Sequence, residues 1–272
     1  MKNFILLLII VGSIFLISSV RVNAQELGQK EPPLTVSNLT SVSFTISWFS
    51  DGSADQALLY GTQEPLDKWA VDDRGLGLQR SSHHVTIRGL IPETEYLFRV
   101  NDKGTTYKVK TAPKLTGVAP LPELFKGTVV TEDGTFPAES IVYLKIEGSQ
   151  LLSRTTDAAG KFMFRTLNIR NADFSYDFRL KETNFVYFFA RAGFEGEGSK
   201  QIYAFSRTNE QTIHLQELLI PFYKIQFPDG SEFAPEVVTT SDPSDAAPQP
   251  ALQTASDESF FGIVWKRVRD IF

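Results

Sequence analysis

The chain has 272 residues, of which 42% are hydrophobic, a formal net charge of −5 and no cysteine. A chain of this length can bury one large or two small cores, and its small negative charge argues against a nucleic-acid binder, which normally carries a basic face. The missing cysteines exclude disulfides, thiolate zinc sites and cysteine nucleophiles.

The first 24 residues have the layout of a secretory signal peptide. Lys2 is a positive n-region, residues 4–20 form an apolar run, and Val22 and Ala24 occupy the −3 and −1 positions. Cleavage would leave Gln25 first. The alternative is an uncleaved anchor, since about 17 apolar residues are at the short end of what spans a bilayer. In either case we expect residues 25 onward to be secreted or to lie at the cell surface.

The segment 32–113 is predicted to form a first antiparallel β-sandwich. Polar and apolar residues alternate without exception from Ser41 to Trp48, which is typical of a half-buried strand. Further alternating runs cover 84–88, 96–100 and 106–111, with polar turns between them. Strands at this spacing favour an all-β sandwich.

A corner between two of these strands carries a family resemblance. In residues 88–100, RGLIPETEYLFRV, Pro92 presets a turn and Tyr96 opens the next strand. The spacing L-x-P-x-T-x-Y, which ends at Tyr96, resembles the tyrosine corner of fibronectin type III domains. The resemblance implies that the Tyr96 ring enters the core and its hydroxyl bonds the upstream backbone. It implies nothing about a ligand.

The same corner, together with Tyr60-Gly61 and His83-His84-Val85, is also similar to the sandwich that precedes the catalytic domain of purple acid phosphatases. The two-metal centre of those enzymes lies in a separate domain. This chain is too short to contain that domain and lacks its histidine-rich motifs. We therefore expect no phosphatase activity. Neighbouring residues on a strand point to opposite faces, so we expect one of the two histidines to pack or hydrogen-bond and the other to face solvent.

The longest irregular segment of the first domain lies between Gly61 and Ser82 and is a candidate binding loop. It contains Trp69, Gly75 and Gly77. Long loops on a rigid sandwich commonly carry recognition, and an exposed tryptophan would be an anchor. The alternative is that Trp69 folds over an open sheet edge. Upstream, Asn38-Leu39-Thr40 is a glycosylation sequon, which matters only in a eukaryotic source.

The segment 118–218 is predicted to form a second sandwich. Its order of K-G-x-V, D-G and T-T-D-A-A-G-K-F-x-F resembles the carboxypeptidase regulatory-like domain, a transthyretin-like accessory sandwich without catalytic residues. Asp133 and Asp157 could bind calcium, but capping turn backbone is the ordinary role of such residues. The aromatic run 185–189 is interpreted as a strand buried on both sides, with an open sugar-stacking face as the alternative.

The tail divides into two parts. Residues 228–256 are rich in Pro, Ser, Ala and acidic residues and have no Lys or Arg, which predicts a disordered acidic linker. Residues 257–272 are predicted to form an amphipathic helix that binds a membrane interface or the groove of a partner protein. Docking of this helix on its own sandwich is the alternative. Its candidate contact residues are Phe261, Val264, Trp265, Lys266, Arg267, Val268, Arg269 and Phe272.

No nucleophile elbow, phosphate loop or metal-ligand spacing occurs in the sequence. We therefore expect no catalytic residues, no cofactor and no nucleic-acid partner. The sequence favours a noncatalytic extracellular protein with two tandem antiparallel sandwiches, whose partner is a cell-surface protein or carbohydrate. Two alternatives stay open: a carbohydrate-binding accessory component of a secreted hydrolase, and a structural part of an envelope assembly docked through the tail.

Overall fold

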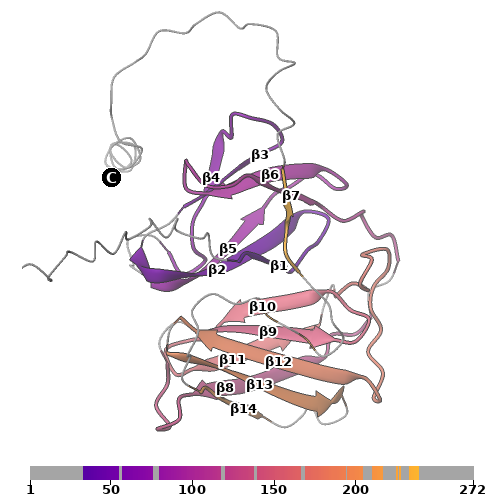
Figure 1. The fold of residues 1–272 in the computed structure, drawn as a ribbon. Coiled ribbons are helices and arrows are strands. Elements are labelled where there is room, and N and C mark those ends of the chain that lie inside the picture. Colours follow the sequence, from indigo (N-terminus) through magenta and orange to yellow (C-terminus); the bar gives the residue numbers. More distant parts are fainter. Residues whose placement is uncertain are drawn as a thin grey trace, which may run out of the picture. The chain divides into compact units, whose positions relative to one another are not determined.

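The structure is a computed structural model that describes residues 33–54, 57–75, 80–117, 120–137, 140–166, 169–193, 195–204, 210–216, 225, 227 and 233–238. All of them belong to the compact unit Pro32–Phe272. Within these ranges the chain forms strands and no α-helix, and no helix long and apolar enough to cross a membrane is found in them. The strands assemble into four sheets (Figure 1), which confirms the predicted all-β class. The predicted signal peptide and tail helix lie outside the described residues.

The first sandwich pairs a three-stranded sheet with a five-stranded one. The first sheet has the order β1 (Thr35–Ser37), β2 (Ser43–Ala54) and β5 (Arg80–Arg88). The second has the order β15 (Glu236–Val237), β7 (Tyr107–Lys110), β6 (Glu95–Val100), β3 (Leu58–Gly61) and β4 (Lys68–Ala70). The alternation along β2 places Phe44, Ile46 and Trp48 in the core, each fully buried.

The tyrosine corner has the geometry that its spacing predicts. Tyr96 is 3% exposed and packs in the first core. The Ile91 N–H donates a hydrogen bond of 3.0 Å to the Tyr96 hydroxyl oxygen. The turn is closed further by Thr111, whose hydroxyl donates to the Ile91 carbonyl oxygen at 2.6 Å.

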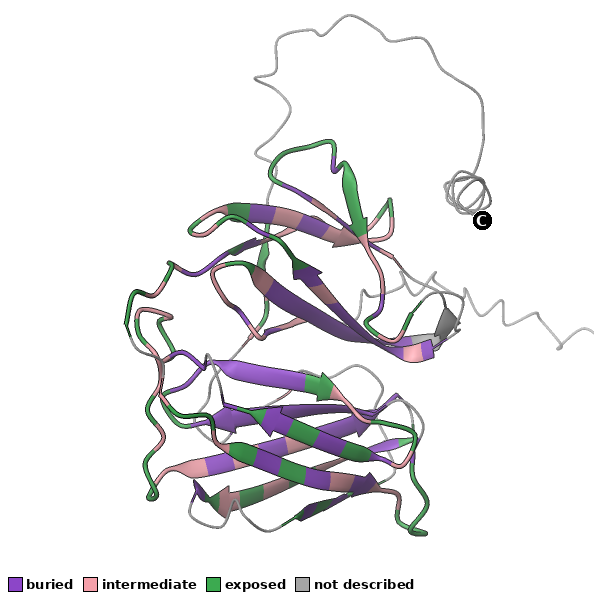
Figure 2. Ribbon diagram, turned by 180° about the vertical axis from the view of Figure 1, so that it is seen from behind, coloured by how far each residue is buried: buried purple, intermediate pink, exposed green. Residues whose placement is uncertain are grey.

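The second sandwich pairs a four-stranded sheet with a three-stranded one. The four-stranded order is β10 (Leu151–Thr155), β9 (Ile141–Ile146), β12 (Phe185–Ala192) and β13 (Gly196–Tyr203). The three-stranded order is β11 (Lys161–Arg165), β8 (Leu124–Val130) and β14 (Gln211–His214). Figure 2 shows the stripes of exposed and buried residues along these strands.

One strand pair is an exception to the predicted antiparallel arrangement. β14 pairs with β8 in parallel, with Ile213 beside Val129. The reason is connectivity: β14 follows β13, which belongs to the opposite sheet. A strand that arrives by a crossover between sheets, instead of by a hairpin, can enter its sheet in either direction.

The chain returns to the first sandwich after completing the second. β15 pairs with β7 in antiparallel register, and the Val36 N–H donates to the Phe233 carbonyl oxygen at 2.6 Å. The structure therefore differs from the predicted 228–256 linker at residues 233–238. Unlike the polar residues around it, this stretch contains Phe233 and Val237. Its backbone forms hydrogen bonds with the edges of β1 and β7.

Candidate functional site

The outer face of the sheet that contains β9 packs against the first sandwich. All six residues of β9 are buried, because its even-numbered residues face its own core and its odd-numbered residues face the first sandwich. The apolar part of this junction consists of Phe49 from β2, Ile141, Tyr143, Leu151 and Phe227. Phe188 lies in the second core while Phe189 packs against the junction. Phe185, Tyr187 and Phe189 are only half-buried, so the 185–189 strand is buried on its core side and partly covered on the other.

Asn38 joins the two sandwiches through its side-chain amide. Its Oδ1 accepts a hydrogen bond from the Ser153 N–H at 3.0 Å, and its Nδ2 donates to the Ser153 carbonyl oxygen at 3.0 Å. Nδ2 also donates to Thr45 Oγ1 at 3.0 Å. Asn38 has a positive φ of 50°, which asparagine tolerates better than most residues. Because this amide nitrogen is occupied, a glycan at the sequon would disrupt the junction.

A chain of three side chains crosses the same junction. His84 Nδ1 lies 2.8 Å from Asp73 Oδ2, and His84 Nε2 lies 2.8 Å from Ser153 Oγ. Burial would raise the pKa of Asp73, but hydrogen bonds from His84 and Thr86 lower it to about 2. The carboxylate is therefore charged at neutral pH and orients the imidazole toward the second sandwich.

Asp73, His84 and Ser153 are linked by hydrogen bonds in the same way as the acid, base and nucleophile of a hydrolase triad. The Ser153 hydroxyl, however, is occupied by contacts across the junction. Its Oγ also lies 2.6 Å from Ser37 Oγ and accepts from Asn38 Nδ2 at 3.2 Å. Ser153 is 5% exposed and His84 4%. A nucleophile has to reach a reacting carbon of its substrate, whereas here the hydroxyl is surrounded by protein. The arrangement serves as a clamp.

The neighbouring histidine is buried too, so the expectation that one of the pair faces solvent is wrong. His83 is 2% exposed and stacks on Trp48 with ring centroids 4.7 Å apart. Its Nε2 lies 3.0 Å from Ser50 Oγ. Burial lowers the pKa of His83 to about 4. Both faces of β5 are covered at this point, one by the first core and the other by the junction.

Arg191 is a buried charge at the junction. It is 1% exposed, and its guanidinium carbon lies 4.3 Å from the ring centroid of Phe49. Its Nε donates to the Gly193 carbonyl oxygen at 3.2 Å. Burial lowers the pKa of Arg191, and burial raises the pKa of nearby Glu197. A further hydrogen bond of 2.8 Å joins Ser47 Oγ to the Tyr143 hydroxyl.

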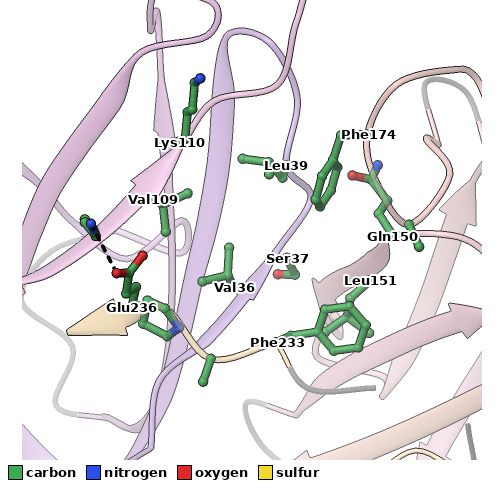
Figure 3. A pocket seen from close by; sticks show the side chains of 14 residues that line it. Val36, Ser37, Leu39, Val109, Lys110, Gln150, Leu151, Phe174, Phe233 and Glu236 are labelled. Atoms are coloured by element: carbon green, nitrogen blue, oxygen red, sulfur yellow. Dashed lines mark ion pairs between the residues drawn. The ribbon is translucent and has the colours of Figure 1, made fainter. Parts of the chain in front are cut away.

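A cavity of about 280 Å³ opens beside the junction, where β1, β7 and the segment 233–236 meet (Figure 3). Its wall is mainly apolar, and an ion pair of 3.2 Å between Lys108 Nζ and Glu236 Oε1 closes one side. The cavity can accept a small, mostly apolar group. The lining residues are Val36, Ser37, Leu39, Lys108, Val109, Lys110, Gln150, Leu151, Ala172, Phe174, Phe233, Ala234, Pro235 and Glu236.

The residues of the predicted binding loop lie elsewhere. Trp69 is 46% exposed and stands on the edge strand β4, opposite Leu59 of β3. It is thus an exposed residue of an edge strand. Gly75 has a φ of 105° and open space where a Cβ would project. Gly77 lies outside the described residues, as do all the candidate contact residues of the tail helix.

The described residues include no group of three or more His, Cys, Asp or Glu side chains that could hold a metal ion. Asp157 Oδ1 accepts hydrogen bonds from the Ala159 and Lys161 N–H groups at 2.9 and 2.8 Å. Asp133 Oδ1 accepts from the Thr135 N–H at 3.2 Å. Both aspartates thus cap the backbone of their turns.

The family match covers the first sandwich, and the structural matches cover more of the chain. No curated protein matches the chain. Among solved structures, "Structure of PhoD" is 15% identical with a TM-score of 0.24 and covers 37% of this chain and 22% of its own. The chicken CNTN1 FN1-FN3 domains are 15% identical with a TM-score of 0.24 and cover 68% of this chain and 66% of their own. Residues 30–112 match the family model of the purple acid phosphatase N-terminal domain, so the first sandwich is similar to that noncatalytic domain.

Proposed function

We propose that the chain is a noncatalytic extracellular protein whose two β-sandwiches, held in a fixed mutual orientation, bind or space partners at the cell surface. The observation that carries this proposal is the hydrogen-bonded clamp of Asn38, His84 and Ser153 across the junction. Hydrogen bonds are directional, and buried polar groups are costly to leave without partners. Such a junction favours one relative orientation, which a spacer or a composite binding surface needs.

The ends of the sequence support placement outside the cytoplasm. The layout of residues 1–24 is that of an export signal, and residues 257–272 have the pattern of a membrane- or partner-binding helix. A rigid body outside the cytoplasm would present the surfaces of its two sandwiches to partners in one mutual orientation. Its partners in this proposal are cell-surface proteins or carbohydrates.

The fixed orientation is tested by distance measurements between two spin labels. The chain has no cysteine, so Lys68→Cys on β4 and Thr212→Cys on β14 would carry the labels without interference. We expect a narrow distance distribution that broadens when Ser153→Ala is added. The matched control is Ser199→Ala, an exposed serine on β13, which should leave the distribution narrow. A broad distribution in the parent protein would refute the spacer proposal.

The noncatalytic part is tested separately with a fluorophosphonate probe, which reacts with activated serine hydroxyls. We expect no labelling of the mature folded protein. Labelling that disappears in Ser153→Ala would show that Asp73, His84 and Ser153 act as a catalytic triad. Turnover on a panel of ester, phosphate and glycoside substrates would refute the noncatalytic part of the proposal.

A second candidate function is carbohydrate binding beside a secreted hydrolase, favoured by the 46% exposure of Trp69. Exposed aromatic rings supply much of the contact energy at binding surfaces. Retention of the mature protein on insoluble polysaccharide, lost in Trp69→Ala and kept in Tyr176→Ala, would support it. Tyr176 is a suitable control because it is 73% exposed. Equal retention of both variants would exclude Trp69 as the sugar contact.

A third candidate is a structural part of an envelope assembly, docked through the predicted tail helix. Deletion of residues 257–272 should then release the protein into the medium. Retention of the truncated protein in the envelope fraction would count against docking by the tail.

A further inference from the structure

The outer face of the sheet β11-β8-β14 is exposed and lies across the second core from the junction. We call it the β8 face. Its strand registers place Lys161 beside Thr128, Met163 beside Lys126 and Arg165 beside Leu124, and residues paired in this way project from the same side of a sheet. Burial alternates along β11 and β8, so these residues point outward while Phe125, Phe162 and Phe164 point into the core. On β14, Thr212 and His214 are exposed on this side.

The β8 face carries fixed positive charge. Lys126, Lys161 and Arg165 are exposed, and none of them takes part in a salt bridge within the described part of the chain. Lys161 and Arg165 stand about 13 Å apart along β11, given a rise of about 3.3 Å per residue. Carboxylates border the face: Thr128 Oγ1 donates to Glu210 Oε1 at 3.4 Å, and Asp157 Oδ1 accepts from the Lys161 N–H at 2.8 Å. Three exposed cations without an ion pair in the described part of the chain thus stand on one face of a chain whose net charge is −5.

Large apolar side chains stand among these cations. Leu124 is 42% exposed and Met163 is 40% exposed. They occupy neighbouring rows of the sheet, opposite Arg165 and Lys126 respectively. Scattered apolar residues on a surface are ordinary, but here they alternate with cations on one flat face. The combination fits a partner that offers negative charge and an apolar layer beneath it.

We propose that the β8 face binds the surface of an anionic phospholipid bilayer. Lys and Arg near such a surface are attracted to the anionic headgroups, while Leu and Met can enter the headgroup–acyl boundary. An anionic polysaccharide offers the charge but no apolar layer, and the described residues that form this face include no Phe, Tyr or Trp ring on which a sugar could stack. The proposal goes beyond a spacer role, because it orients the rigid body against the membrane.

The predicted tail helix would be a second membrane contact in the same chain. Stable attachment to a bilayer usually takes two weak signals acting together. A tail that holds the protein at the membrane would raise the effective concentration of the β8 face near the lipid. The experiment therefore keeps the tail in every variant, so that differences between variants report on the face alone.

The test is co-sedimentation of mature full-length protein with phosphatidylcholine vesicles that do or do not contain phosphatidylglycerol. We expect Lys126→Gln, Lys161→Gln and Arg165→Gln together to lower partitioning onto anionic vesicles about 100-fold, or roughly fivefold per charge. The control variant carries Lys68→Gln, Lys103→Gln and Lys110→Gln on the first sandwich. It has the same net charge and should bind like the parent. Equal losses in both triple variants would overturn the proposal.

Insertion is read out independently by an environment-sensitive fluorophore. On the parent background, Met163→Cys provides a single thiol on the β8 face and Lys68→Cys a single thiol on the first sandwich. We expect a blue shift with anionic vesicles at residue 163 and none at residue 68. Absence of a shift at 163, or a shift produced by polygalacturonate instead of vesicles, would refute the membrane assignment.

Discussion

Nε2 of His84 lies 2.8 Å from Oγ of Ser153, although the two residues belong to different sandwiches and are 69 positions apart in the chain. The contact is anchored behind His84 by Asp73 and around Ser153 by Asn38 and Ser37. The residues that resemble a triad thus join two domains, and their hydrogen bonds fix the sandwiches to one another.

Ser153→Ala should lower the free energy of unfolding by about 1–3 kcal/mol, because it removes the hydroxyl that the buried His84 Nε2 and Ser37 Oγ share as their partner. Urea unfolding followed by intrinsic fluorescence measures the change. Ser199→Ala, an exposed position in the same sandwich, should change it by less than about 0.5 kcal/mol. Comparable losses in the two variants would argue against a clamp.

The protein should lose stability as the pH falls from about 6.5 to about 4. His83 has a folded-state pKa of about 4, lowered by burial from 6.5, so in this range the unfolded chain binds the proton and the native state does not. The loss attributable to His83 reaches about 3 kcal/mol once the pH lies below the folded-state pKa.

Urea unfolding at a series of pH values measures this dependence. His83→Gln should flatten the slope between pH 4 and 6.5, whereas His214→Gln, an exposed position on β14, should leave it unchanged. Asp73 acts in a lower window, since its pKa drops from 3.8 to about 2 on folding. A slope that survives in His83→Gln would assign the acid sensitivity to another group.

Tyr96→Phe should cost about 1–2 kcal/mol of unfolding free energy. The ring stays in the core, but the Ile91 N–H loses its acceptor at 3.0 Å. Thermal unfolding of Tyr96→Phe compared with Tyr176→Phe measures the effect. Tyr176 is 73% exposed, and its hydroxyl should contribute nothing measurable. Unchanged stability in Tyr96→Phe would mean that the corner is held by packing and by Thr111 alone.

Gly127→Ala should destabilise the second sandwich by several kcal/mol or prevent its folding. A Cβ at Gly127 would lie 2.1 Å from the Gln211 carbonyl oxygen and 2.5 Å from the Phe162 ring, which would force β8 and β14 apart. Gly117→Ala is the control, since nothing lies within 4 Å of its Cβ position. Soluble yield and melting temperature of the two variants compare the effects, and a native-like Gly127→Ala would contradict the close packing at the parallel pair.

Local patterns predicted the strands and the corner well. The alternation of β2 and the seven-residue spacing that ends at Tyr96 depend on near neighbours in the chain, so the sequence displays them directly. The pairings of His84 with Ser153 and of β15 with β7 join distant segments, and no local pattern encodes such partners.

One signal for the junction was present in the sequence: Ile141 to Ile146 is apolar on both faces apart from Lys145, as expected of a strand covered on both sides. The β8 face likewise depends on register, since the exposed cations of β8 and β11 become neighbours only when the strands pair.

The pairing of β15 with β7 has a consequence for synthesis. A nascent chain emerges from its amino end, so the first sandwich leaves the ribosome long before residues 236–237 are made. The edge of β7 stays uncovered while the second sandwich is translated, and an uncovered edge invites association with other strands. The first sandwich is therefore the first to be synthesised and the last to be completed. An export pathway that carries the unfolded chain across the membrane would let both sandwiches and β15 assemble together.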